Sequence, residues 1–532
     1  MDLSAKISFL RSENRLTQEE FALRLGVSRQ SVQKWESGSS QPTPEHLVKM
    51  AGEFNISLDG FLCEKSLRIA EETERDIKPV YSSLHGWQKY SAGLDVEYAQ
   101  CLDEGLEVEK YKPYFESVKS LPEGELREAA ADIVFRLIRG CRTREGYGFY
   151  EPSDYINIVS CRPDSGRKAV KAPDKSTLKS KIEGAWYGRI CGCLLGKPIE
   201  GIKRKELIPF LKKTGNYPMR RYIVSGDVID YESLGNKFVI RNNFADKLAS
   251  APSDDDTNYT VLYQKLIERY GVGFTPGEVS DFWLKMQPKD AYCTAERVAF
   301  CNFVNGYLPP DSAVRKNPYR EWIGAQIRGD YFGYINPGDP AKAAEMAYRD
   351  ACISHVKNGI YGEMFVAAMI AEAAVNDEIT DIVRAGLDQI PEKSRLFTEI
   401  SGMLDDYRSG TDYSTAINKI TAKYNDESGH HWCHTVSNAR IVTAALLYGK
   451  GDFGRSVGLA VQEGFDTDCN GATVGSVIGI MKGSEAIGEC WKKPINGRLK
   501  TDIFGCETVT VEELVSKTLE HIEQNVPDKS DR

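Results

Sequence analysis

Residues 464–475 read "GFDTDCNGATVG" and place Asp466 and Asp468 one residue apart, just before a run of very small side chains. Carboxylates this close repel each other and cost free energy unless a positive charge lies between them. The glycines that follow, Gly471 and Gly475, suit a helix that packs closely against another helix. The stretch therefore predicts a helix entrance that is used either for close packing and capping or for holding a cation.

A second acidic stretch, "SAPSDDDTNYTVL" at residues 250–262, also lies immediately before a predicted helix. It contains Asp254, Asp255 and Asp256. Aspartates at a helix start are commonly N-caps, since the helix dipole and the free N–H groups there favour anions. Two clusters of oxygen ligands in one helical domain favour a divalent cation such as Mg²⁺, which prefers about six oxygens.

Helical periodicity dominates the chain from Ser176 to about residue 525, and strand-like alternation is scarce there. The clearest helical segments are residues 176–196, 258–271, 340–355, 362–375 and 438–449. Many of their apolar positions are Ala or Gly, which allow helices to approach one another closely. We therefore predict an all-α fold with a buried helical bundle as its largest part.

Composition describes an ordinary globular protein. The chain has 532 residues, 41% of them apolar and 27% charged, with a formal net charge of −9. Its N-terminus has no apolar signal core, and no apolar run approaches the roughly 18 residues of a membrane span. The 13 cysteines read as reduced thiols rather than as a disulfide framework. We expect a cytoplasmic protein without a membrane partner.

The first 62 residues predict a compact group of short amphipathic helices. Thr17 and Glu20 form a capping box before one helix, and Gly26 ends it. Ser28 and Thr43 are expected to cap the two helices that follow. The predicted core positions are Ile7, Leu10, Phe21, Leu25, Val32, Leu47, Met50 and Phe54.

Changes in composition divide the chain into three segments. Residues 1–64 form the N-terminal domain, and residues 176–525 form the large helical domain. Between them, residues 65–175 mix helical patterns such as "LREAAADIVFRLIRG" with stretches rich in Pro, Gly, Ser and Lys. We interpret this middle segment as a helical and irregular connecting region.

Four blocks of the large domain resemble the ADP-ribosylglycohydrolases, also called ADP-ribosyl-acceptor hydrolases. They are "IEGAWYGRICGCLLGKPIEG", "SDDDTNYT", "ACISHVKNGIYGE" and "GFDTDCNGATVGSVIG", in the order of the family. The resemblance implies a large orthogonal all-α bundle around two Mg²⁺ ions that bind the ribose of ADP-ribose. The ligands that it implies are Asp254, Asp255, Asp256, Asp466, Asp468 and Cys469.

The chain departs from the family pattern at three positions. Asp254 stands where the family usually has Thr or Ser, and an extra carboxylate is a good ligand for a hard cation. Cys469 replaces a hydroxyl, and Cys193 replaces an Asp that is common in the first block. Thiolates prefer softer metals than Mg²⁺, so these cysteines leave the substrate type and the rate open.

The resemblance also implies roles in chemistry. Glu200 matches a glutamate near the metals, and we expect it to take the proton of the attacking water, with Asp466 or Asp255 sharing this role. His355 matches a histidine that contacts the ligand.

Two further segments suggest possible sites. From composition alone, residues 329–340 read as a substrate loop, with Asp330, Tyr331 and Asn336 as possible contacts, or as an ordinary connection. The segment "SGHHWCH", residues 428–434, is spaced too tightly for a usual zinc site, and we do not interpret it as one.

The N-terminal segment resembles the Cro/C1-type helix-turn-helix family, which implies a five-helix domain that binds double-stranded DNA. Gln18 would open the second helix, and residues 28–35 would form the recognition helix. The DNA-contacting residues that the resemblance implies are Gln18, Ser28, Arg29, Gln30, Gln33 and Lys34, with Arg29, Gln30 and Gln33 at base edges. A protein–protein module of the same fold is the alternative. Such heads usually act as dimers, so a homodimer is one possible state.

Three functions are compatible with these features. The first is a Mg²⁺-dependent hydrolase that removes ADP-ribose from an acceptor and carries an operator-binding head. The second is a transcription regulator that senses an ADP-ribose-like metabolite without turnover, an option that Cys193 and Cys469 motivate. The third is a ribosyl N-glycosidase that acts on a small molecule.

Overall fold

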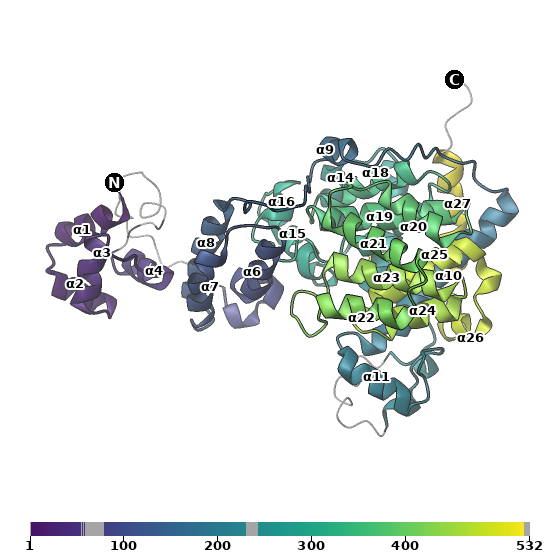
Figure 1. Ribbon diagram of the computed structural model, residues 1–532, viewed down its shortest axis with the longest axis horizontal. Coiled ribbons are helices and arrows are strands. Elements are labelled where there is room, and N and C mark those ends of the chain that lie inside the picture. The colour runs from purple at the N-terminus through teal and green to yellow at the C-terminus, as the bar shows by residue number, and fades with distance from the viewer. Residues whose placement is uncertain (1, 55, 57, 59–78, 230–242, 526–532) are drawn as a thin grey trace. The chain divides into compact units, whose positions relative to one another are not determined.

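The structure of the chain is a computed structural model, which describes residues 2–54, 56, 58, 79–229 and 243–525. The chain divides into two compact units, residues 1–147 and residues 148–532. The expected connecting region, residues 65–175, is therefore shared between the two units. Figure 1 labels the elements of both.

Helices are the main regular elements among the described residues of the first unit. Its helices are α1 (Leu3–Glu13), α2 (Gln18–Leu25), α3 (Arg29–Glu36), α4 (Pro44–Glu53), α6 (Leu94–Asp103), α7 (Lys112–Lys119) and α8 (Glu125–Arg139). The predicted fifth helix of the N-terminal domain lies outside the described residues. All eight predicted core positions of this domain are buried in one apolar cluster, which confirms that prediction.

Local capping signals define α2, α3 and α4. Thr17 and Glu20 form the predicted capping box, and Gly26 ends α2 in the left-handed conformation, with φ at 67°. Ser28 accepts a hydrogen bond from the backbone N–H of Ser31 and so caps α3. Thr43 is the N-cap residue of α4, but its side chain does not cap the helix. Its hydroxyl is hydrogen-bonded to Nδ1 of His46, 2.7 Å away, and this corrects the prediction.

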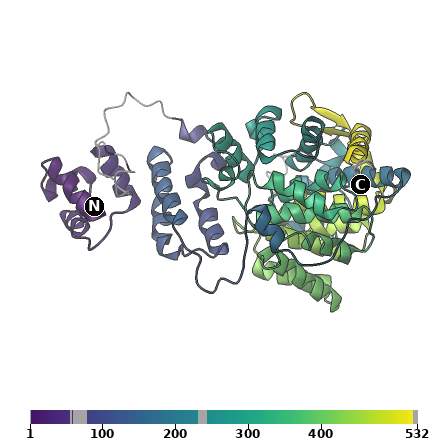
Figure 2. The same cartoon turned by 90° about the horizontal axis from the view of Figure 1, so that it is seen from above.

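The second unit is a large helical bundle with one small hairpin. Its helices are α9 (Tyr155–Ser160), α10 (Lys175–Gly196), α11 (Arg204–Lys213), α13 (Asp255–Tyr270), α14 (Pro276–Met286), α15 (Thr294–Val304), α16 (Asp311–Val314), α17 (Asp330–Tyr334), α18 (Pro340–Ala351), α19 (Asn358–Ala373), α20 (Ile379–Leu387), α21 (Arg395–Arg408), α22 (Tyr413–Lys423), α23 (Thr435–Gly449), α24 (Phe453–Val461), α25 (Thr467–Lys482), α26 (Glu489–Lys492) and α27 (Val511–Asn525). Strands β1 (Arg498–Lys500) and β2 (Thr508–Thr510) pair antiparallel beside α27, as Figure 2 shows in yellow. The all-α prediction is confirmed.

Helices α10 and α25 form the centre of this unit and lie against each other along their length (Figure 1). Each carries a glycine at every fourth position, so the glycines line one face of each helix. On α10 these are Gly184, Gly188, Gly192 and Gly196, and on α25 and its C-cap they are Gly471, Gly475, Gly479 and Gly483. A Cβ atom on Gly188 would lie 2.0 Å from the carbonyl oxygen of Gly475, so only glycine permits this contact.

The helices around this pair are buried on all sides and mostly apolar. All residues of α19 and of α23 are buried, as expected for helices in the middle of a bundle. Despite this apolar character, none of the helices in the described part of the chain has both the length and the hydropathy needed to cross a membrane. The cysteines of the described residues are free thiols.

Candidate metal centre

The glycine contact places the end of α10 beside the start of α25. A Cβ atom on Gly196 would lie 2.3 Å from the backbone nitrogen of Asp468, so the two backbones touch at this point. The Thr467 hydroxyl donates a hydrogen bond to the Gly196 carbonyl, over 3.0 Å. Lys197 and Glu200, which follow α10, are thereby brought close to the aspartates that open α25.

The two acidic stretches meet at this point. One ligand atom each from Asp256, Asp468 and Cys469 lies within 4.8 Å of the others, and all three residues are buried. A second group, whose ligand atoms also lie within 4.8 Å of one another, consists of Cys193, Asp254 and Asp256. Asp256 belongs to both groups, so two stretches about two hundred residues apart in sequence form one buried centre.

Two buried or half-buried cations hold the first stretch in place. Arg189 of α10 is fully buried and contacts Oδ1 of Asp256 at 3.0 Å and Oδ2 of Asp330 at 3.0 Å. Burial alone would lower the pKa of Arg189, but the charges of Asp330 and Asp256 raise it above its ordinary value. Lys197 places its ammonium on Oδ2 of Asp254. Sequence reasoning missed both cations, although they lie in the first block of the family resemblance.

Asp254 serves as a helix cap as well. Its Oδ1 accepts a hydrogen bond from the backbone N–H of Asp256 over 3.0 Å at the start of α13. Burial would raise the pKa of Asp254, but Lys197 holds it below its ordinary value. Asp254 therefore has the capping role that we considered for this stretch, and it is also paired with Lys197.

Asp466 occupies the N-cap position of α25 but makes no capping hydrogen bond. The Cys433 thiol donates to its Oδ2 over 3.3 Å, and its backbone N–H donates to Oδ1 of Asn438 over 3.2 Å. The preceding residue, Phe465, has a φ of 59°, a strained conformation for an aromatic residue. The backbone therefore holds the Asp466 carboxylate away from the helix end and toward the centre.

The crowded carboxylates shift one another's pKa values upward. Burial, followed by the charge of Glu200, raises the pKa of Asp466 to about 6. Burial and the charges of Glu200 and Asp254 raise the pKa of Asp468 well above its ordinary value. Burial also raises the pKa of Asp256 well above its ordinary value, although the positive charge of Arg189 acts to lower it. Burial is the first cause of each of these shifts, and the neighbouring negative charges add to it.

Glu200 and Asp255 lie at the more open side of the centre, since both are only partly buried. Burial and the charges of Asp254 and Glu200 raise the pKa of Asp255 well above its ordinary value. The charges of Asp255 and Glu200 also raise the pKa of the Cys293 thiol, after burial as the main cause. Cys293 and Cys433 thus join Cys193 and Cys469 as thiols beside the carboxylates, and their sequence positions gave no signal of this.

Only part of residues 329–340 is irregular, since residues 335–339 connect α17 to α18. Residues 330–334 are helix α17, and Asp330, Tyr331 and Asn336 are all buried. The Tyr331 hydroxyl is hydrogen-bonded to Nδ1 of His521 at 2.5 Å, and Oδ1 of Asn336 accepts from the Asn525 side chain at 2.8 Å. Of the three, only Asp330 lies next to the centre, through Arg189.

His355 is buried just beyond α18, and its Nδ1 is hydrogen-bonded to the hydroxyl of Ser354 at 2.8 Å. Burial and the nearby charge of Arg328 lower its pKa well below the ordinary value, so the imidazole is neutral. The same arginine pairs with Asp350 at 2.7 Å and with Glu296 at 3.1 Å. His355 thus belongs to a buried charge network and not to the two carboxylate groups.

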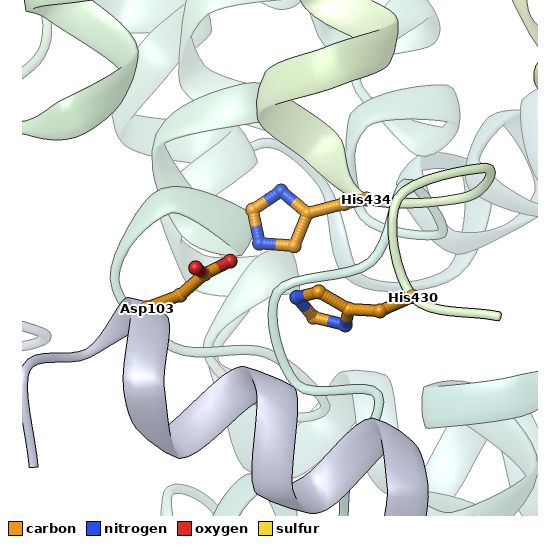
Figure 3. Close-up of side chains that lie close together, drawn as sticks. All are labelled: Asp103, His430 and His434. Carbon is orange, nitrogen blue, oxygen red and sulfur yellow. The ribbon is translucent and has the colours of Figure 1, made fainter. Parts of the chain in front are cut away.

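The histidines of residues 428–434 have structural partners. Figure 3 shows the imidazoles of His430 and His434, whose ring centroids are 4.9 Å apart; Asp103, also drawn there, belongs to the first unit. The Trp322 indole donates to Nδ1 of His430 at 3.3 Å, and Nδ1 of His434 accepts from the backbone N–H of Val436 at 3.1 Å. This segment contributes the Cys433 thiol to the carboxylate centre.

The first unit presents a polar face on α3. Arg29, Gln30, Gln33 and Lys34 are exposed, whereas Val32 and Trp35 of the same helix are buried. Ser28 is exposed but is engaged in capping α3. Gln18 is half-buried and donates to Oε2 of Glu36 over 2.6 Å. Its side chain therefore ties the start of α2 to the end of α3.

Comparison with known proteins agrees with this division. Residues 174–525 match the ADP-ribosylglycohydrolase family, and residues 8–61 match a helix-turn-helix family. The chain belongs to the ADP-ribosylglycohydrolase family and carries a helix-turn-helix domain in its first unit. Both resemblances seen in the sequence are thereby confirmed.

Individual relatives cover parts of the chain. The HTH-type transcriptional activator BcrR of Enterococcus faecalis is 35% identical over 88 residues, which is 16% of this chain and 43% of that protein. The chain thus spans less than half the length of this relative. A solved structure described as an ADP-ribosylglycohydrolase-related protein complex covers 66% of this chain and 100% of its own, with 18% identity and a TM-score of 0.40.

Proposed function

We propose that the second unit is a divalent-cation-dependent hydrolase that cleaves the glycosidic bond between ADP-ribose, or a related ribosyl group, and an acceptor. The observation that carries the proposal is the approach of Asp256 and Asp468, whose ligand atoms lie within 4.8 Å in a domain of the ADP-ribosylglycohydrolase family. Two buried carboxylates from distant stretches are costly to bring together unless they share a cation.

The residues of the centre fit a divalent cation. Oδ2 of Asp256 and Oδ1 of Asp468 are buried and have no hydrogen-bond partner among the described residues. Unpaired buried carboxylate oxygens are rare in folded proteins, and a cation would satisfy both. The expectation of two Mg²⁺ ions per site, with Asp254, Asp255 and Asp466 as further ligands, stays a prediction.

Cleavage at the anomeric carbon passes through an oxocarbenium-like state and needs an activated water. A divalent cation bound here would supply Lewis-acid chemistry, orienting hydroxyl oxygens and lowering the pKa of a bound water. Glu200 is a partly exposed carboxylate whose charge acts on Asp466 and Asp468, so we assign it the role of accepting the proton of the water. Asp255 and Asp466, which both interact with the charge of Glu200, would share that proton.

The first unit is proposed to bind a double-stranded DNA operator through α3. The support comes from the helix-turn-helix match and from the exposure of Arg29, Gln30 and Gln33 on that helix. Arg and Gln pair with guanine and adenine edges in the major groove. Residues 1–62 carry seven Lys or Arg against eight Asp or Glu, so we expect only a modest contribution from counterion release.

The hydrolase proposal is tested with ADP-ribosyl-arginine, ADP-ribosyl-serine, ADP-ribosylated nucleic acid and NAD-related compounds. We expect EDTA to abolish release of the ribosyl product, and Asp466→Asn combined with Asp468→Asn to do the same at unchanged circular dichroism. Full activity of that double variant would remove the two aspartates from the mechanism.

A second candidate is a regulator that binds an ADP-ribose-like metabolite without turnover. It is favoured by the thiols of Cys193 and Cys469 and by the ammonium of Lys197, which stand among the carboxylates. Calorimetry with ADP-ribose beside the product assay separates the two candidates. Tight binding with no product from any substrate of the panel supports the sensor, and turnover of a free small molecule alone supports a ribosyl N-glycosidase.

A further inference from the structure

The donor atoms of the centre fall into two groups with the same composition. Each group, Cys193–Asp254–Asp256 and Asp256–Asp468–Cys469, offers two carboxylates and one thiol within 4.8 Å. The groups share Asp256, so the described residues provide two neighbouring positions for positive charge.

The chain itself supplies the cation for the first position. The Lys197 ammonium contacts Oδ2 of Asp254, whose Oδ1 accepts the backbone N–H of Asp256 at 3.0 Å. Both oxygens of Asp254 are therefore occupied by protein donors. A metal ion at this position would have to displace a positively charged side chain that is only 18% exposed.

At the second position, formed by Asp256, Asp468 and Cys469, two carboxylate oxygens lack a hydrogen-bond partner among the described residues. Arg189 contacts Oδ1 of Asp256 and leaves Oδ2 without a hydrogen-bond partner among the described residues, and the same is true of Oδ1 of Asp468. Asp256 is 0% exposed and Asp468 is 3% exposed, so bulk water does not satisfy them. Cys469, the next residue on α25, adds a buried thiol, 6% exposed, to these two oxygens.

We propose that this centre binds one thiophilic divalent ion, of the Zn²⁺ or Co²⁺ type, through Asp256, Asp468 and the thiolate of Cys469, while the Lys197 ammonium takes the place of a second ion. A thiolate ligand selects borderline-soft ions over Mg²⁺, which binds almost only oxygen. Binding replaces the thiol proton with the metal ion and releases the proton to solvent, with no change of oxidation state. The inference rests on the carboxylate centre of the proposed function, and it assigns the ion and its number.

The test uses the full-length protein after removal of metals with a chelator and titrates it with Co²⁺. We expect saturation at one ion per chain and a thiolate-to-cobalt charge-transfer band in the near ultraviolet. Cys469→Ser should lose the band and weaken Co²⁺ binding by at least about 10–100-fold, the range for loss of a hydrogen-bond partner that only supports a ligand. Cys193→Ser is the matched thiol control and should retain the band.

The stoichiometry provides a second, independent measurement. Lys197→Met removes the built-in cation, and we expect the ion count to rise from one to two in the same titration. In the unmodified protein, calorimetric competition should show Zn²⁺ displacing Mg²⁺ at equal concentration, a result that does not depend on the folding of any variant.

Three results would overturn the inference: a band that survives Cys469→Ser, two ions bound in the unmodified chain, or preference for Mg²⁺ over Zn²⁺. These readouts are separate from turnover. A protein that binds Co²⁺ as described but releases no ADP-ribose supports this inference and counts against the hydrolase.

Discussion

Gly188 of α10 and Gly475 of α25 face each other so closely that a Cβ atom on either glycine would lie within 2.1 Å of the other's carbonyl oxygen. This contact belongs to a ladder of glycines that ends where the backbones of Gly196 and Asp468 meet. The ladder thus sets the position of the second acidic stretch. Close packing of the two helices and assembly of the carboxylate centre are one structural requirement.

Gly188→Ala should therefore disturb both stability and the centre. The added methyl group has no space, and overpacking of a rigid backbone contact costs on the order of 1–3 kcal/mol or more. We expect the free energy of unfolding, measured by urea denaturation, to fall by at least that amount. Gly402→Ala on α21 is the control, since its Cβ meets nothing within 4 Å. An equal effect of the two substitutions would contradict the role of the ladder.

Arg189→Met should destabilise the second unit. The substitution leaves the buried carboxylates of Asp256 and Asp330 without their shared cation, and breaking a buried pair costs about 3–5 kcal/mol. Arg408→Met on α21 removes an exposed arginine, whose side chain is 46% accessible, and should change stability by less than about 0.5 kcal/mol. Chemical denaturation of both variants measures the difference, and similar values would show that Arg189 is not needed to hold the carboxylates.

The contribution of Asp466 to the stability of the metal-free protein should decrease as the pH rises from about 4 to about 7. The folded-state pKa of Asp466 is raised to about 6, so the folded state binds a proton more tightly than the unfolded state does. Below the pKa of Asp466 in the unfolded state, this proton makes its full contribution to stability. The contribution is lost as the pH rises through the pKa of the folded state, and its total is on the order of 2–3 kcal/mol. Urea denaturation at pH 4 and at pH 7 measures this change in the free energy of unfolding.

Asp466→Asn should flatten this pH dependence, because the variant side chain has no proton to lose. Asp405→Asn, an exposed aspartate of α21, is the matched control and should leave the dependence intact. A saturating divalent cation should also reduce the loss at pH 7, since it replaces the proton. An unchanged pH dependence in Asp466→Asn would contradict the pKa shift of Asp466.

Arg29→Ala should reduce affinity for an operator selected from a random DNA library. Arg29 is exposed at the start of α3, and one good contact to a base contributes about 1–3 kcal/mol. We therefore expect a loss of about tenfold or more in a fluorescence anisotropy titration at fixed salt. Arg139→Ala, at the exposed end of α8, removes the same charge and should have little effect. Equal losses would indicate attraction by net charge alone.

Local signals in the sequence predicted much of this architecture. The capping box of Thr17 and Glu20 and the left-handed Gly26 depend only on neighbouring residues, and both are present. The same is true of the aspartates before α13 and α25, which mark helix starts in any context. Thr43 failed as a cap because a side chain three residues away, His46, takes its hydroxyl.

The remaining features depend on tertiary contacts. Residues 329–340 read as a substrate loop or a connection from their composition, but Gly329 and Gly333 permit close packing on α19. A Cβ atom on Gly333 would lie 2.6 Å from Ile370. The pairing of Arg189 with Asp256 and Asp330 likewise depends on how three separate helices pack. Helical spacing identifies such residues as core or surface but does not identify their partners.

The most direct test of the account is the position of a bound ion. Crystals of the full-length protein soaked with Mn²⁺ or Zn²⁺ would be measured at the absorption edge of the metal, and an anomalous difference map would be calculated. We expect a peak bounded by the carboxylates of Asp256 and Asp468. A peak only at other residues, or none at saturating metal, would contradict the claim that these two acidic stretches share a cation.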